Sequence, residues 1–103
     1  MSYITEDKQK GNIKMKAVIT VTGKDNVGII AKVATLCSEH GANISDISQT
    51  VLSDYFAMIM LVDIKALNVE FGVFSDLLKQ VGSDNSLDIH AMHEDIFNSM
   101  HRI

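Results

Sequence analysis

Residues 23–49, GKDNVGIIAKVATLCSEHGANISDISQ, join the end of one strand, a whole helix and the first part of another strand. Apolar side chains recur in this segment at the spacing of one helix face: Ile30, Val33, Ala34 and Cys37. We expect Asp25 and Asn26 to cap the start of the helix, and Gly41 to end it in a left-handed conformation. The segment therefore predicts a strand–helix–strand unit.

The neighbouring segments predict three strands around this helix. Residues 16–23 are mostly β-branched and place Ala17, Ile19 and Val21 on the side opposite to Val18, Thr20 and Thr22, which is typical of a strand with one strongly apolar face. Residues 43–52 predict a second strand, in which Ile44 and Ile47 are three positions apart and indicate a bulge. A short polar turn separates it from residues 55–64, the most apolar strand, so the two should form an antiparallel hairpin.

The second half of the chain continues the same alternation of elements. Asn68 is a favourable helix cap and Gly82 a favourable stop. The apolar stripe between them consists of Phe74, Leu77, Leu78 and Val81. Residues 87–92 alternate in polarity and predict a fourth strand, and residues 94–103 predict a short terminal helix.

These elements follow the order βαββαβ with a final helix. The right-handed crossover rule and the matched halves favour a ferredoxin-like α+β sandwich: a four-stranded antiparallel sheet with both long helices on one face, plus a short C-terminal helix. Both faces of the 55–64 strand are apolar, so the uncovered face requires a partner subunit, the terminal helix, or both. We expect residues 1–14 to form a flexible leader before a single domain at 15–103.

Composition excludes several classes of protein. The 103 residues allow one core. The net charge is −4 and the nine Lys and Arg residues are scattered, so we expect no nucleic acid partner. Cys37 is the single cysteine, which excludes an intramolecular disulfide and favours a cytoplasmic location. No apolar stretch is long enough for a signal peptide or a membrane span, so we expect no membrane partner.

The turn before the first helix is the strongest candidate for a binding site. Gly23 and Gly28 bracket it, and the amides at the helix start lie at the positive end of the helix dipole. A carboxylate or another anion suits such a position. The alternative is purely structural, with Gly28 permitting close packing while Asp25 and Asn26 only cap the helix.

The same segment resembles the signature of the ACT domain family. Residues 25–31, DNVGIIA, are similar to its Asp-x-Pro-Gly-hydrophobic motif, and residues 40–44, HGANI, with Gln49 are similar to its Gly-x-Asn-Ile strand start. The similarity covers residues 15–92. It is particularly similar to small stand-alone bacterial ACT proteins and to the ACT segments of formyltetrahydrofolate deformylase and the glycine-cleavage regulator.

This resemblance implies a non-catalytic regulatory domain that binds an amino acid or a related metabolite between two copies of the chain. The ligand-binding positions that it implies are Asp25, Asn26, Val27, Gly28, Asn43 and Ile44. Val27 replaces the common proline, which leaves one additional amide hydrogen in the turn. Asn43 offers a donor and acceptors that suit an amino acid, and it is equally suited to a turn after Gly41.

The other reactive side chains have structural explanations. His90, His93, Glu94 and His101 are residue types that zinc or nickel selects, but they also suit the surface and the ends of the terminal helix. His40 is placed to contact the last carbonyl groups of its helix. Cys37 lies on an apolar stripe, which predicts a buried, inert thiol. We therefore expect no catalytic residue, metal or cofactor.

Three functions remain open from the sequence. The first is a homodimeric or higher oligomeric ACT domain that binds an amino acid and regulates a separate, unidentified protein. The second is a dimerisation module without a ligand. The third is a small enzyme or metal-binding protein that uses the histidines near the C-terminus.

Overall fold

The structure of the chain is a computed structural model that describes residues 15–24 and 28–100. The expected leader at residues 1–14, the turn residues Asp25, Asn26 and Val27, and residues 101–103 of the expected terminal helix lie outside these ranges.

Seven elements follow one another in the described ranges, in the predicted order βαββαβ with a final helix. They are β2 (Lys16–Lys24), α1 (Ile29–Glu39), β3 (Asn43–Leu52), β4 (Tyr55–Asp63), α2 (Phe71–Asp84), β5 (Leu87–His93) and α3 (Glu94–Met100). None of these helices has the length and apolar character needed to cross a membrane.

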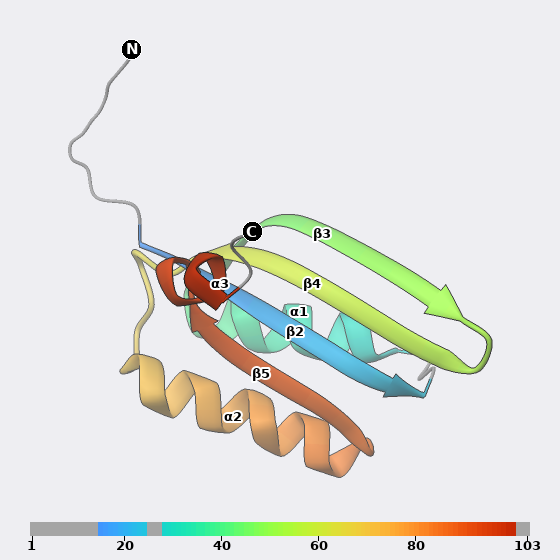
Figure 1. Cartoon of the computed structure of the whole chain (residues 1–103). Coiled ribbons are helices and arrows are strands. Elements are labelled where there is room, and N and C mark those ends of the chain that lie inside the picture. Colours follow the sequence, from blue (N-terminus) through green and yellow to red (C-terminus); the bar gives the residue numbers. More distant parts are fainter. Residues whose placement is uncertain (1–14, 25–27, 101–103) are drawn as a thin grey trace.

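The described strands form one antiparallel sheet in the order β3-β4-β2-β5 (Figure 1). β2 is central, and its Val21 lies opposite Met58 of β4 and Ile89 of β5. β3 and β4 form the predicted hairpin, and their register shifts between Ile44 and Asp46, which confirms the predicted bulge. The ferredoxin-like α+β sandwich is therefore confirmed.

The core lies between the sheet and the two long helices, which cover the same sheet face (Figure 1). α1 buries Ile29, Val33 and Cys37, while α2 buries Phe74, Leu78 and Gly82. Alternate residues of three strands point towards them: Ala17, Ile19, Val21, Phe56, Met58, Met60, Val62, Leu87 and Ile89. Burying one large apolar side chain contributes about 1.5–3 kcal/mol, so this cluster is the main source of folding free energy.

The opposite sheet face is only partly covered. α3 lies on this face and contacts β2 and β5 (Figure 1), and Val18, which points to this side, is 4% exposed. Towards the β3–β4 turn, Tyr55 and Ile59 remain 59% and 45% exposed. The terminal helix thus covers part of the face that the sequence predicted to need a cover, and leaves the rest open.

Two predicted helix starts are wrong. Gly28 itself occupies the N-cap position of α1, so this position falls neither on Asp25 nor on Asn26. Asn68 does not cap α2, because its side-chain amide donates a 3.1 Å hydrogen bond to the backbone oxygen of Glu39. α2 begins three residues after Asn68, without a side-chain cap.

Two glycines predicted to end helices differ in their roles. Gly41 follows the end of α1 in a left-handed conformation with a φ of 81°, as predicted. A Cβ at this position would clash with the carbonyl oxygen of Ala66. The prediction that Gly82 ends α2 is wrong, because Gly82 is buried inside the helix. A Cβ at Gly82 would lie 2.6 Å from the carbonyl oxygen of Leu87, so the absence of a side chain lets α2 approach β5 closely.

Candidate functional site

The start of α1 forms the first part of the candidate site. Gly28 adopts φ 89° and ψ −2°, a left-handed conformation that favours glycine. Gly28 is exposed, and an added Cβ would meet no atom of the described chain within 4 Å. No side chain among the described residues caps α1, and its first turn contains no acidic residue. The amides of this turn therefore present positive potential to an anion.

Asn43 and Ile44 form the second part, after the other end of α1. They line a hollow of about 380 Å³ together with Ala34, Ser38, Gly41 and Ala42. The amide of Ala42 donates a 2.8 Å hydrogen bond to the carbonyl oxygen of Cys37, which fixes the turn that leads into β3. Asn43 is exposed while Ile44 is half-buried against the core, so the hollow combines an amide group with an apolar wall.

One chain does not bring these two parts together. Gly28 precedes α1 and Asn43 follows it, and the 11 residues of the helix span about 16 Å. Of the predicted binding residues, Asn43 and Ile44 are therefore neighbours and Gly28 is separate. Asp25, Asn26 and Val27 lie outside the described residues.

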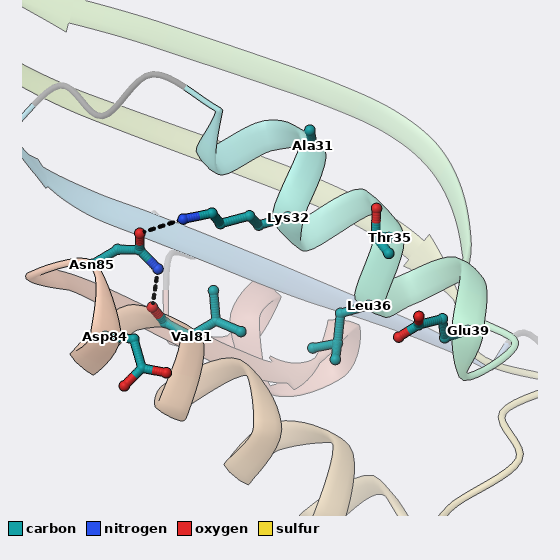
Figure 2. Close-up of a pocket in the computed structure, with 8 residues that line it drawn as sticks. All are labelled: Ala31, Lys32, Thr35, Leu36, Glu39, Val81, Asp84 and Asn85. Atoms are coloured by element: carbon teal, nitrogen blue, oxygen red, sulfur yellow. Dashed lines mark hydrogen bonds between the residues drawn. The ribbon is translucent and has the colours of Figure 1, made fainter.

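A groove between α1 and α2 was not predicted from the sequence. Figure 2 shows its lining, and its volume is about 510 Å³. The residues that line this α1–α2 groove are Ala31, Lys32, Thr35, Leu36, Glu39, Val81, Asp84 and Asn85. They come from two helices far apart in sequence, so only the packing of both helices on the sheet reveals the groove.

Cys37 is fully buried in the core, as predicted. Desolvation raises the pKa of its thiol from 9.0 to about 11. The thiol therefore stays protonated at neutral pH and is a poor nucleophile, so Cys37 has no part in the candidate site.

The histidines make local contacts. Nδ1 of His40 lies 2.9 Å from the carbonyl oxygen of Leu36, which confirms the predicted contact at the helix end. His90 and His93 point to opposite faces of β5, and the His93 ring stacks on Phe71 with centroids 4.2 Å apart. Within the part of the chain that the structure describes, no three His, Cys, Asp or Glu residues are grouped to hold a metal ion.

Comparison with known proteins agrees with this architecture. The ACT domain family matches residues 16–91, and the chain belongs to this family. A UPF0237 protein of Clostridium perfringens is 52% identical over 89 residues, which cover 86% of this chain and 100% of that protein. Similar UPF0237 proteins occur in archaea as well as in bacteria, so the relatives extend beyond the expected bacterial ones.

Solved structures show the same relationship. An ACT domain protein from Streptococcus pneumoniae has a TM-score of 0.71 and 38% identity, covering 86% of this chain and 100% of that chain. A formyltetrahydrofolate deformylase from Pseudomonas syringae has a TM-score of 0.69 over 77% of this chain and 28% of its own. Its identity of 22% makes this a similarity of fold alone.

Proposed function

We propose that this chain is a non-catalytic regulatory domain that binds an amino acid or a related small carboxylate and acts as a homodimer on a separate protein. The observation that supports this most directly is the start of α1, where the N-cap residue is the left-handed, exposed Gly28 and no side chain among the described residues caps the helix. Membership of the ACT family favours the same class of ligand. The cytoplasmic location stays a prediction from the sequence.

The edge of the sheet supports a dimer. β3 is an outer strand, so one side of its backbone faces no other strand among the described residues. It contains no Lys, Arg or Pro, which commonly protect such an edge from pairing. Ile47 and Val51 of this strand are 39% and 60% exposed. Pairing with β3 of a second copy would satisfy the edge and cover these side chains.

Antiparallel pairing of two β3 strands would also complete the candidate site. The last residue of β2, Lys24, and the last residue of β3, Leu52, both pair with Tyr55 of β4. The end of β2, which leads to Gly28, therefore lies at the same end of the sheet as the end of β3. Asn43 begins β3 at the other end. Because antiparallel strands run in opposite directions, each copy's Asn43 would approach the Gly28 of the other copy.

The groups assembled in this way match the chemistry of an amino acid. The amides that follow Gly28 would donate hydrogen bonds to the ligand carboxylate. The side-chain oxygen of Asn43 would accept a hydrogen bond from the ligand ammonium, and Ile44 would contact an apolar side chain. Asp25, Asn26 and Val27 lie outside the described residues, and their contact with the ligand stays a prediction from the family resemblance.

Thermal unfolding with single amino acids tests this proposal. A ligand at 100 times its dissociation constant adds about 2.7 kcal/mol of stability, which raises the Tm of a domain of this size by about 10 °C or more. Gly28→Asp should remove this response, because the new carboxylate repels the ligand carboxylate. Gly28→Asn has a similar size without the charge and should respond more than Gly28→Asp.

Gly72→Asp is a matched control, because it introduces the same carboxylate at an exposed glycine of α2. It should keep the full ligand response. If no amino acid changes the Tm while the chain remains a dimer, the alternative function of a ligand-free dimerisation module would explain the exposed Ile47 and Val51 instead. A monomer without any response would contradict both functions.

A further inference from the structure

We propose that the hollow beside Asn43 receives the side chain of the bound amino acid, and that Ser38 selects an uncharged polar side chain there. This selectivity rests on the proposed function, because it concerns the ligand of the same site. The favoured ligand is an amino acid whose short side chain carries a hydroxyl or a carboxamide group, such as threonine or asparagine. The position of the hollow, its polar groups and the absence of charge in its lining support this choice.

The hollow lies on the flank of α1 that is turned towards β3. Ala34 and Ser38 are one helical turn apart and line it together with the first residues of β3. The other flank of α1, with Lys32 and Thr35, lines the α1–α2 groove instead. Because β3 is an outer strand, a second copy paired with it would place its own Gly28 next to the hollow rather than next to the groove.

Two exposed polar side chains line the hollow, and both are available to a ligand. Within the described part of the chain, neither the hydroxyl of Ser38 nor the side-chain amide of Asn43 makes a hydrogen bond. If the oxygen of Asn43 accepts from the ligand ammonium, its Nδ2 remains a donor and the Ser38 hydroxyl a donor and acceptor. A polar ligand side chain replaces the hydrogen bonds that these groups make with water, whereas an apolar one does not.

The remainder of the lining disfavours a charged side chain. Its other residues are small or apolar, namely Ala34, Gly41, Ala42 and Ile44, so no described residue that lines the hollow is charged. An ionised side chain would lose water there without gaining an opposite charge. Ile44 is half-buried and contacts the carbon atoms of the ligand. The favoured side chain therefore combines an apolar part beside Ile44 with a hydrogen-bonding group towards Ser38.

Calorimetric titration of the full chain with pairs of amino acids of similar shape tests this selectivity. Threonine and valine differ by the replacement of a hydroxyl with a methyl group, and asparagine and aspartate differ in charge. We expect threonine to bind about five- to ten-fold more tightly than valine, which corresponds to about one net hydrogen bond. Asparagine should bind at least about ten-fold more tightly than aspartate.

Variants of Ser38 locate the selecting group. Ser38→Ala should bind threonine and valine with equal affinity, whereas Ser38→Thr keeps the hydroxyl and should keep the preference. Thr35→Ala is the matched control, because it removes a hydroxyl from an exposed position on the other flank of α1, and it should also keep the preference. Circular dichroism and sedimentation velocity should show the same fold and the same assembly for all three variants.

Failure of this selectivity is distinguishable from failure of the proposed function. Equal binding of threonine and valine to the wild type, or tighter binding of valine or aspartate, would overturn the selectivity alone, because an amino acid still binds. An unchanged preference in Ser38→Ala would also overturn it, since another group would then select the side chain. If no amino acid binds in calorimetry, the proposed function fails and the selectivity fails with it.

Discussion

Replacing the buried Gly82 of α2 by alanine tests how closely this helix packs on the sheet. Helix propensity alone predicts that the change stabilises the fold by up to about 1 kcal/mol. The structure predicts the opposite result. The new Cβ would lie 2.6 Å from the carbonyl oxygen of Leu87, and 3.1 and 3.2 Å from Cγ1 and the backbone nitrogen of Ile89. Two of these three neighbours are backbone atoms, so α2 has to move away from β5.

The size of the effect follows from these two opposing terms. Forcing an extra methyl group into a packed core costs about 1–3 kcal/mol, which exceeds the gain in helix propensity. We expect the upper part of this range, about 2–3 kcal/mol, because backbone atoms cannot rotate away from the new methyl group. After subtraction of a propensity gain of about 1 kcal/mol, Gly82→Ala should lower the free energy of unfolding by about 1–2 kcal/mol. For a domain of this size, that corresponds to a decrease in Tm of about 5–15 °C.

Urea unfolding followed by circular dichroism measures this change directly. Gly72→Ala provides the matched control, because Gly72 is exposed in the same helix and no atom of the described chain lies within 4 Å of its added Cβ. Gly72→Ala should be neutral or stabilise the protein by several tenths of a kcal/mol. If Gly82→Ala unfolds at the same urea concentration as the wild type or at a higher one, the close approach of α2 to β5 is incorrect.

Two further predictions concern the buried thiol and the sheet edge. Burial raises the pKa of the Cys37 thiol from 9.0 to about 11, so the protonated thiol stabilises the fold fully below pH 9, and this stabilisation is lost as the pH rises towards 11. Urea titrations at several pH values should therefore show that the free energy of unfolding falls at alkaline pH by roughly 2–3 kcal/mol less in Cys37→Ala than in the wild type. An identical alkaline loss in both proteins would show that the thiol does not contribute. Val51→Lys should convert the dimer to a folded monomer in sedimentation velocity, because it places a charge at the exposed β3 edge. Val73→Lys, at a 46% exposed site on α2, should remain dimeric, and a dimeric Val51→Lys would argue against pairing through β3.

Local patterns in the sequence predicted most of the fold. The alternation in β2 and the helical stripes of α1 and α2 reflect the burial of one face of each element, and the continuous apolar run of β4 indicates a strand. Each of these patterns lies within a single segment of the sequence. The spacing of Ile44 and Ile47 indicated the bulge, and Gly41 indicated a left-handed residue. These features depend on neighbouring residues, so the sequence was sufficient for them.

The errors involve contacts between distant segments. Gly82 resembles a helix stop, but its neighbour is the backbone of Leu87 on the adjacent strand. Asn68 resembles a cap, but its amide bonds to Glu39 at the end of the other helix. The α1–α2 groove has the same origin, because Leu36 and Val81 meet there only after both helices pack on the sheet. The sequence predicts both Asn43 and Gly28 as binding residues, but in one chain they lie at opposite ends of α1.

Mixing two inactive variants tests most directly whether the ligand site is shared between two copies. Gly28→Asp and Asn43→Ala should each bind no amino acid in calorimetry, since each damages both sites of its own dimer. After subunit exchange, every mixed dimer should contain one site built from an intact Gly28 and an intact Asn43, which restores about a quarter of the wild-type capacity. A mixture that binds as little ligand as the separate variants, despite proven subunit exchange, would contradict a site shared across the dimer.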